Sequence, residues 1–328
     1  MKRRITGKRA AVILTVLSLM AAMVGAACAP YDFGQQKTSE TDSMETPGDV
    51  RLAEDFKESS GLIFNTDHSR PDARNRLSDI GSYICYYSGY SPDVMEKMSN
   101  VDLAIIDARY IGGAPYLPEG GAPYIAGLKA AGTLTVVYLA VGEEMEREYD
   151  PVKGWYLSDE LSVWYSYPVD PGNEKWQEKV LTDAKRLMAQ GADGLFLDTI
   201  DSAFGDFPFV KPDMASLIRK IRDACPDAIL IANRGFDIAA DIAPVIDGYM
   251  FEGFSSDYTQ IPLMQPSFNY NDRVANELND LASQYGFRII SLDYTDDIND
   301  PITDMYRQRS ADFGFLLYIA PSRLDSIY

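Results

Sequence analysis

The sequence predicts an α/β protein, built as a (β/α)8 TIM barrel in a single domain. Eight short β-rich runs follow one another from residue 82 onward, and helical patterns lie between them. Near-continuous apolar strands separated by helices are typical of a parallel sheet covered on both faces. Eight such units in about 250 residues match the count and size of a (β/α)8 barrel. A doubly wound open sheet is the alternative fold, but its usual Gly-rich first turn, G-x-G-x-x-G, does not occur in the chain.

The expected elements alternate regularly along the chain. We expect strands at residues 82–88, 102–108, 134–142, 194–200, 228–235, 248–254, 288–294 and 313–320. Helices are expected at residues 122–132, 174–191, 214–224 and 273–286. In the second of these helices the apolar residues recur on one face, and Gly132 is a suitable C-cap for the first. Each strand is therefore followed by an element that can cover the outside of a barrel.

The N-terminus carries a secretory pattern. Five basic residues precede an apolar stretch from Ala10 to about Ala27, and small residues lead to Cys28. This arrangement resembles a bacterial lipobox, in which Cys28 is lipidated. A plain signal peptide or a single N-terminal anchor helix are the alternatives. We therefore expect a lipoprotein signal peptide at 1–28, a flexible polar linker at 29–60, and the barrel at 61–328, displayed on a bacterial cell surface and touching the membrane only through its lipid.

The charge of the chain restricts its partners. Residues 1–28 contain five of the 30 Lys and Arg residues and no acid, so the mature chain has 25 basic and 49 acidic residues and a net charge of −24. Such a charge argues against binding to nucleic acid or to anionic membrane surfaces. It is compatible with a cationic or neutral ligand, or with solubility alone. We expect a monomer.

The scarcity of cysteine and histidine restricts the chemistry. Besides Cys28 there are only Cys85 and Cys225, which we expect to be buried and inert, with a single disulfide as the alternative. His68 is the only histidine, so an HExxH zinc site is excluded. No cofactor and no metal site are expected. Acid–base chemistry must therefore come from carboxylates, Tyr or Lys.

Polar residues gather where the expected strands end. In a TIM barrel the C-terminal ends of the strands converge on one face, where active sites lie. Acids occur at several of these ends, which is more than helix capping requires. The candidates are Tyr86, Tyr87, Asp107, Arg109, Tyr138, Glu143, Glu144, Asp198, Asp201, Asn233, Arg234, Glu252, Asp293 and Tyr318.

Two of these acids follow apolar strand cores directly. Asp198 comes after Leu-Phe-Leu and Glu252 after Tyr-Met-Phe, so rigid backbone would hold both. Paired carboxylates are the machinery of glycoside hydrolysis, and an apolar setting raises the pKa of a proton donor. The long segment from Glu143 to Asn173 carries several aromatic residues, among them Trp155, Tyr156, Trp164, Tyr165 and Tyr167. Aromatic rings can stack on sugars, although such a segment could also pack its aromatics into a small core of its own.

Four segments together resemble a known family. They are YLAVGE (138–143), DGLFLDTID (193–201), ANRG (232–235) and YMFEGF (249–254). The chain over about residues 80–320 is similar to the endo-α-1,4-polygalactosaminidases, glycoside hydrolase family 114. The resemblance implies a secreted barrel that cleaves galactosamine-rich polysaccharide, with Asp198 as nucleophile and Glu252 as general acid/base. We expect a retaining mechanism.

The remaining candidates are expected to bind the substrate or to position the acids. Asp107, Glu143 and Asp293 could bind amino groups, and Asn233 and Arg234 could bind hydroxyls or orient Asp198. Asp201 is expected to pair with Arg234 or a neighbouring strand, with substrate contact as the alternative. The competing functions are a non-catalytic carbohydrate-binding barrel and a barrel enzyme of another class, such as a lyase or deacetylase.

Overall fold

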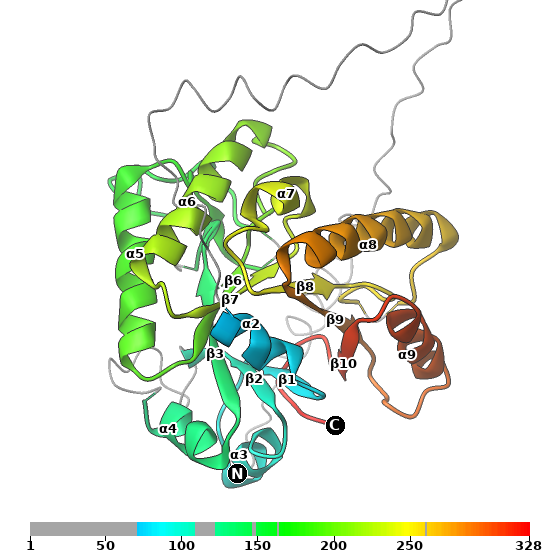
Figure 1. Ribbon diagram of the computed structural model, residues 1–328. Coiled ribbons are helices and arrows are strands. Elements are labelled where there is room, and N and C mark those ends of the chain that lie inside the picture. Colours follow the sequence, from blue (N-terminus) through cyan, green and yellow to red (C-terminus); the bar gives the residue numbers. More distant parts are fainter. Residues whose placement is uncertain (1–70, 109–121, 146–148, 163, 260) are drawn as a thin grey trace, which may run out of the picture. The chain divides into compact units, whose positions relative to one another are not determined.

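The computed structural model describes residues 71–108, 122–145, 149–162, 164–259 and 261–328. Eight parallel strands lie in the order β1-β2-β3-β6-β7-β8-β9-β10 and form a nearly closed barrel (Figure 1). At the seam, the rings of Tyr83 and Tyr318 are 5.6 Å apart. The eight expected strands are confirmed within the predicted ranges. Their bounds are β1 Tyr83–Tyr86, β2 Leu103–Ile106, β3 Leu134–Ala140, β6 Gly194–Asp198, β7 Ile229–Asn233, β8 Gly248–Glu252, β9 Arg288–Tyr294 and β10 Leu316–Ala320.

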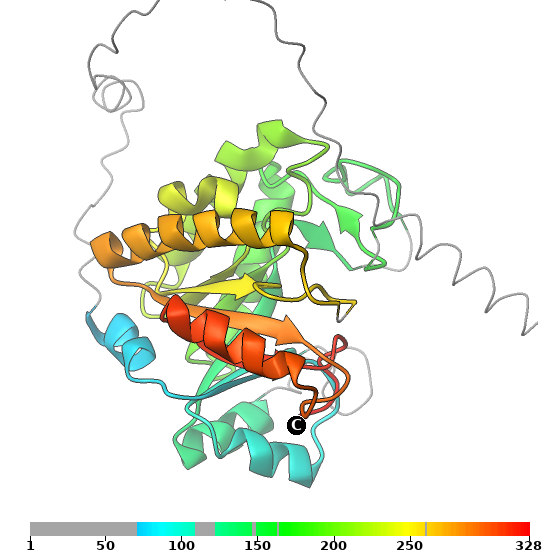
Figure 2. The same ribbon diagram turned by 90° about the vertical axis from the view of Figure 1, so that its right-hand side faces the viewer.

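Helices cover the outside of the barrel (Figures 1 and 2). Long helices follow β6, β8 and the insertion after β3, and each carries apolar residues toward the sheet. The α-helices are α2 Pro71–Ser78, α3 Pro92–Met98, α4 Ala122–Ala131, α5 Glu174–Ala189, α6 Lys211–Ala224, α7 Ala239–Ile242, α8 Gln265–Tyr285 and α9 Ile302–Asp312. The short 3-10 helices are η2 Pro208–Val210 and η3 Phe236–Ile238. Gly132 follows α4 with a φ of 92°, in keeping with the C-cap predicted there.

Two apolar layers hold the barrel together. One fills the lumen and includes Cys85, Phe196 and Met250. The other lies between the strands and the surrounding helices and includes Leu197 and Phe251. Because side chains alternate along a strand, neighbours in sequence go to different layers. The lumen layer also contains Ala73 and Leu77 of α2, so this helix covers the end of the barrel where the strands begin (Figure 1).

The segment between β3 and α5 folds into a small subdomain. Strands β4 (Glu143–Glu144) and β5 (Tyr167–Pro168) pair antiparallel. Most of its aromatics pack on one another: the ring centroids of Tyr156 and Tyr167 are 5.4 Å apart, and those of Tyr149 and Tyr156 are 4.9 Å apart. The insertion therefore has the small aromatic core that the sequence analysis gave as an alternative. Trp164 is not part of it, since 52% of this residue is exposed.

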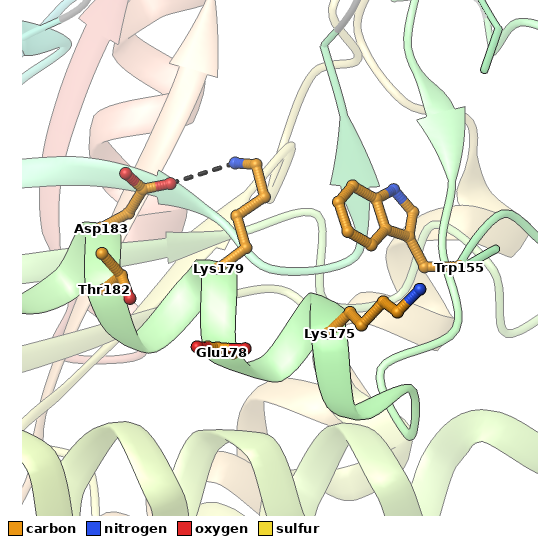
Figure 3. Close-up of a pocket in the computed structure, with 6 residues that line it drawn as sticks. All are labelled: Trp155, Lys175, Glu178, Lys179, Thr182 and Asp183. Carbon is orange, nitrogen blue, oxygen red and sulfur yellow. Dashed lines mark hydrogen bonds and ion pairs between the residues drawn. The ribbon is translucent and has the colours of Figure 1, made fainter. Parts of the chain in front are cut away.

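A surface pocket lies beside this subdomain, on the outer face of α5 (Figure 3). It encloses about 470 Å³ and is lined by Trp155, Lys175, Glu178, Lys179, Thr182 and Asp183. Lys179 is bound to Asp183 of the same helix at 3.0 Å. The pocket contains none of the acids that end the barrel strands, so it is separate from the site described below.

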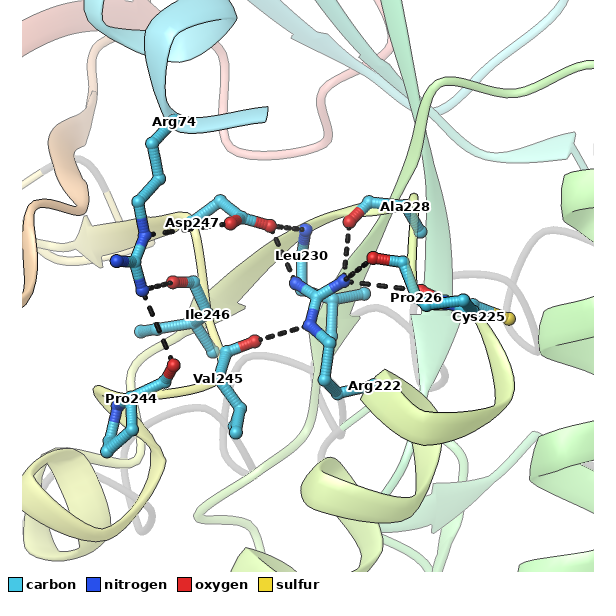
Figure 4. Close-up of polar contacts among 10 residues, drawn as sticks. All are labelled: Arg74, Arg222, Cys225, Pro226, Ala228, Leu230, Pro244, Val245, Ile246 and Asp247. Atoms are coloured by element: carbon cyan, nitrogen blue, oxygen red, sulfur yellow. Dashed lines mark hydrogen bonds and ion pairs between the residues drawn. The ribbon is translucent and has the colours of Figure 1, made fainter. Parts of the chain in front are cut away.

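A buried ion-pair network ties α6 to the beginnings of the strands (Figure 4). Arg222 donates to Asp247 at 2.6 Å, and both side chains are shielded from solvent. Its other nitrogens donate to the carbonyls of Val245, Ala228, Cys225 and Pro226. The second oxygen of Asp247 lies 3.8 Å from Arg74 of α2. The network therefore joins three elements at the end of the barrel opposite the strand C-termini.

Cys85 and Cys225 are free and buried, as expected. Within the described ranges, no helix has the length and apolar character needed to cross a lipid bilayer. The predicted signal peptide, Cys28, the linker, His68 and Arg109 lie outside the described residues.

Candidate active site

Three polar residues face the mouth of the barrel from adjacent strands. Asp198, Asn233 and Glu252 are the last residues of β6, β7 and β8. Each lies two residues after a side chain of the lumen layer, namely Phe196, Ile231 and Met250. Because strand side chains alternate with a period of two, all three point to the lumen side. The parallel register then brings their side chains together, although they are far apart in sequence.

The side-chain amide of Asn233 joins the two acids. Its Nδ2 donates to Oδ1 of Asp198 at 2.8 Å and to Oε2 of Glu252 at 2.7 Å. The two acceptor oxygens can therefore be no farther apart than about 5.5 Å, which is the sum of the two hydrogen-bond lengths. Only 3% of Asn233 is exposed, so rigid surroundings hold this bridge.

Two tyrosines complete the polar contacts of the acids. The hydroxyl of Tyr294 donates to Oε1 of Glu252 at 2.5 Å. The hydroxyl of Tyr138 is hydrogen-bonded to Asp198. Both rings belong to the lumen layer, where burial raises the pKa of Tyr294 well above its usual value. Each carboxylate is thus oriented by one neutral phenol and by the shared amide.

Burial and mutual repulsion change the ionisation of the pair. Loss of solvation, and next the negative charge of Glu252, raise the pKa of Asp198 from 3.8 to about 6. The hydrogen bonds from Asn233 and Tyr138 act in the opposite direction. The charge of Glu252 therefore helps to decide whether Asp198 is ionised.

Left-handed backbone ends all three strands. The next residues, Thr199, Arg234 and Gly253, have φ values of 63°, 53° and 72°. This conformation costs a non-glycine residue roughly 1–2 kcal/mol, so the surroundings must enforce it. At Thr199 they do, because its Oγ1 accepts from the backbone N–H of Gly142 at 2.9 Å. A Cβ on Gly142 would lie 2.0 Å from the Thr199 carbonyl oxygen, so only glycine allows this approach.

Arg234 and Asp201 form a pair beside the acids, as the sequence suggested. The guanidinium of Arg234 lies 3.4 Å from Asp201 and donates to the backbone carbonyl of Glu252 at 3.2 Å. The negative charges of Asp201 and Glu252 raise the pKa of Arg234 against the opposing effect of burial. The pair therefore braces the loops after β6 and β7 and supports the position of Glu252.

Two candidates from the sequence need correction because they lie on the outward faces of their strands. Tyr86 packs in the layer between strands and helices, and its hydroxyl donates to the carbonyl of Gly89 at 2.7 Å. Asp293 is fully buried and accepts from the backbone N–H groups of Ser255 and Ser256 at 2.6 and 2.9 Å. Neither side chain reaches the pair of acids. Their neighbours Tyr87 and Tyr294 pack with the lumen layer instead.

The other predicted residues divide into three groups. Asp107 is buried at the end of β2, in phase with the lumen residue Ile105, and Tyr318 packs against the lumen layer. Glu143 is 5% exposed and accepts a hydrogen bond from Ser166, so it fastens the insertion. Glu144 likewise accepts from Trp155 and Tyr156. Trp164 is exposed on the insertion.

Reasoning from the sequence missed two residues of this region. Tyr294 was passed over for Asp293, although the alternation along β9 would have selected it. Tyr258, in the loop after β8, has its ring centroid 5.1 Å from that of Trp164, and it carries no sequence signal beyond its aromatic ring. Within the described part of the chain, no group of three or more His, Cys, Asp or Glu side chains is arranged to hold a metal ion.

A barrel with two oriented carboxylates at its mouth is the arrangement that glycoside hydrolases use. The model of glycoside-hydrolase family GH114 matches residues 72–328, and the chain belongs to this family. The predicted family resemblance is thereby confirmed.

Two solved structures share the fold, and one curated protein is similar in sequence. The glycoside hydrolase domain of PelA from Pseudomonas aeruginosa is 22% identical with a TM-score of 0.63, covering 76% of this chain and 97% of its own. The Aspergillus fumigatus Ega3 complex with galactosamine is 16% identical with a TM-score of 0.54, covering 75% and 93%. An uncharacterized protein of Thermotoga maritima is 25% identical over 260 residues, covering 69% of this chain and 76% of its own.

Proposed function

We propose that the protein cleaves galactosamine-rich or related amino-sugar polysaccharide with retention of configuration, Asp198 acting as nucleophile and Glu252 as general acid/base. Membership of family GH114 supports glycosidic bond cleavage. The structural neighbour Ega3 was solved with galactosamine, which favours an amino sugar. The excess of acidic residues, net charge −19 over the whole chain, suits a polymer that carries ammonium groups.

The observation that carries the proposal is the amide bridge of Asn233. It limits the two facing oxygens, Oδ1 of Asp198 and Oε2 of Glu252, to a separation of at most about 5.5 Å. Retaining enzymes hold their two carboxyl groups about 5–5.5 Å apart, whereas inverting enzymes need about 6.5–9.5 Å to admit a water molecule. The pair of Asp198 and Glu252 therefore suits direct attack by one carboxylate better than attack by a water molecule held between them.

The proposed reaction has two steps. Asp198 attacks the anomeric carbon while Glu252 gives its proton to the departing glycosidic oxygen, which leaves a glycosyl ester on Asp198. Water then attacks the same carbon, Glu252 takes its proton, and the ester bond breaks. Because the charge of Glu252 contributes to the raised pKa of Asp198, protonation of Glu252 favours the ionised Asp198 that the first step requires.

Product release from a panel of polysaccharides tests the activity. The panel includes partly deacetylated galactosaminogalactan, and the wild type is compared with Asp198→Asn and Glu252→Gln. We expect oligosaccharides from the wild type alone, with kcat reduced at least about 1000-fold in both variants. A wild type and variants that bind the glycan equally and release nothing would instead establish the alternative, a non-catalytic carbohydrate-binding barrel.

Chemical rescue tests the assignment of roles. Azide added to Asp198→Gly should yield a glycosyl azide of inverted configuration from an activated aryl glycoside, because azide replaces the nucleophile. Azide added to Glu252→Ala should yield the retained configuration, because it intercepts the ester on Asp198. The opposite pair of configurations would exchange the two roles.

We further propose that the protein is a secreted, monomeric lipoprotein of a bacterial cell surface, anchored through Cys28 and binding no nucleic acid. The lipobox-like pattern before Cys28 supports the anchor. In a bacterial host, wild type should incorporate labelled palmitate and sediment with membranes, whereas Cys28→Ala should do neither. Equal labelling of both would remove the anchor from the proposal.

A further inference from the structure

An exposed aromatic pair joins two loops at the catalytic face. Trp164 belongs to the insertion after β3, and Tyr258 belongs to the loop after β8. Their ring centroids are 5.1 Å apart with an edge-to-face angle of 65°, although 52% of Trp164 and 38% of Tyr258 remain exposed. Large exposed aromatics that are held in place are typical of binding surfaces.

The sheet order places this pair across the mouth of the barrel. Strands β6 and β7 lie between β3 and β8. The shorter way between the C-terminal ends of β3 and β8 runs past the ends of β6 and β7, where Asp198 and Asn233 lie. Figure 2 shows the insertion and the segment after β8 on the side to which the strand arrows point. The pair therefore belongs to the same face as the acids.

A buried carboxylate anchors each of the two loops. In the insertion, Glu143 binds Ser166, whose hydroxyl is 2.8 Å from that of Ser162 at the base of the Trp164 turn. The next residue, Tyr165, is held with a φ of 59°. A strained residue fixed by its surroundings is characteristic of functional sites.

In the other loop, Asp293 holds the N–H groups of Ser255 and Ser256. Asp257 then closes the turn around Tyr258 by accepting from the N–H of Thr259 at 2.8 Å. The two acids that the sequence suggested as substrate ligands, Glu143 and Asp293, thus position the loops that carry the aromatic pair.

We infer that Trp164 and Tyr258 form an aromatic bridge that binds an amino-sugar unit of the polymer outside the bond being cleaved; this rests on the proposed function. A sugar ring presents C–H groups to an aromatic face, and a neighbouring ammonium group is attracted by the same π-system. The rings act as a platform and contribute no proton to the reaction. Their loss therefore weakens binding of the long polymer without changing the chemical step.

Kinetics with two substrates test the bridge. For the deacetylated polymer, Trp164→Ala and Tyr258→Ala should each raise KM roughly tenfold with kcat within about twofold. Hydrolysis of a short aryl glycoside should remain unchanged. Trp164→Phe and Tyr258→Phe keep a ring and should restore most of the affinity. Val152→Ala serves as the control, since Val152 is 84% exposed in the same insertion and is not part of the bridge.

Binding measured without catalysis separates this inference from the proposed function. Trp164 is the exposed one of three tryptophans, so its fluorescence should change when the polymer is added to Asp198→Asn, and the change should be absent in Asp198→Asn/Trp164→Phe. Equal polymer affinity in Trp164→Ala, Tyr258→Ala and wild type would overturn the aromatic bridge alone. If the wild type binds the polymer but does not cleave it, the proposed function is overturned. The aromatic bridge is then still tested by the polymer affinity of the variants. Wild type that does neither would overturn both.

Discussion

The ionisation of Asp198 couples the site to the stability of the protein. Its pKa is raised from 3.8 to about 6, so the folded state binds this proton more tightly than the unfolded state. The stabilisation is fully present below pH 3.8 and is lost as the pH rises through about 6. The wild type therefore loses stability in the pH range where Asp198 becomes charged.

Asp198→Asn should be more stable than wild type at neutral pH, because the uncharged amide needs no costly ionisation. We expect its free energy of unfolding to exceed that of wild type by roughly 1–3 kcal/mol at pH 8 and by much less at pH 4.5. Urea denaturation at both pH values measures the difference. Asp159→Asn, at an exposed position, is the control. An advantage of equal size at both pH values would show that the effect does not come from ionisation.

Asn233 should set the position of the acidic limb of the activity profile. Its hydrogen bond lowers the pKa of Asp198, so Asn233→Ala raises it, and the acidic limb of kcat/KM moves to higher pH. We expect kcat at the optimum to fall roughly 10–100-fold because both carboxylates lose their shared donor. Asn276→Ala, on the exposed face of α8, is the matched control. If kcat falls but the acidic limb of kcat/KM stays at the same pH, Asn233 has only a structural role.

At the scale of elements, the ends of neighbouring strands fit together through glycine. The N–H of Gly142 reaches the hydroxyl of Thr199, and this contact holds the turn that follows Asp198. Beyond β8, Asn271 of α8 donates to the carbonyls of Gly253 and Phe254 at 3.1 and 2.9 Å. The orientation of each acid thus depends on the neighbouring elements as well as on its own strand.

Gly142→Ala should disturb this junction, because the new Cβ would lie 2.0 Å from the Thr199 carbonyl oxygen. The end of β6 must shift, which we expect to cost roughly 1–3 kcal/mol of stability and at least tenfold in kcat. Gly89→Ala is the control, since a Cβ there meets nothing within 4 Å. Thermal unfolding and polymer hydrolysis together give the result, and normal values for both in Gly142→Ala would contradict the tight approach.

At the scale of the whole molecule, the barrel separates stability from function. The acids lie where the strands end, whereas the Arg222–Asp247 network lies where they begin (Figure 4). In this architecture the loops of the catalytic face can vary while the rest of the barrel keeps the fold stable. Substitutions in the network should therefore affect folding without affecting the chemistry.

Arg222→Met should lower the free energy of unfolding by roughly 3–5 kcal/mol, because it removes the nearer of the two arginines that face the buried carboxylate of Asp247. Arg219→Met, three residues earlier on α6 and 3.9 Å from Asp241, should cost less than about 1 kcal/mol. Chemical denaturation measures both, and kcat of the folded Arg222→Met protein should match wild type. A changed kcat would mean that the two ends of the barrel are coupled.

The barrel, its eight strands and the two strand-ending acids could be predicted from the sequence, because apolar runs, helical periodicity and the alternation of elements are local signals. The sequence also identified Asn233, Arg234, Asp201 and Tyr138 as neighbours of the acids. The side of each strand that faces the lumen became clear from the three-dimensional structure. A shift of one residue reverses that side, which is why the sequence offered both Tyr86 and Tyr87, and why it suggested Asp293 although Tyr294 faces inward. The amide bridge of Asn233 and the contact between Trp164 and Tyr258 likewise depend on strand order and loop packing, which no local pattern contains.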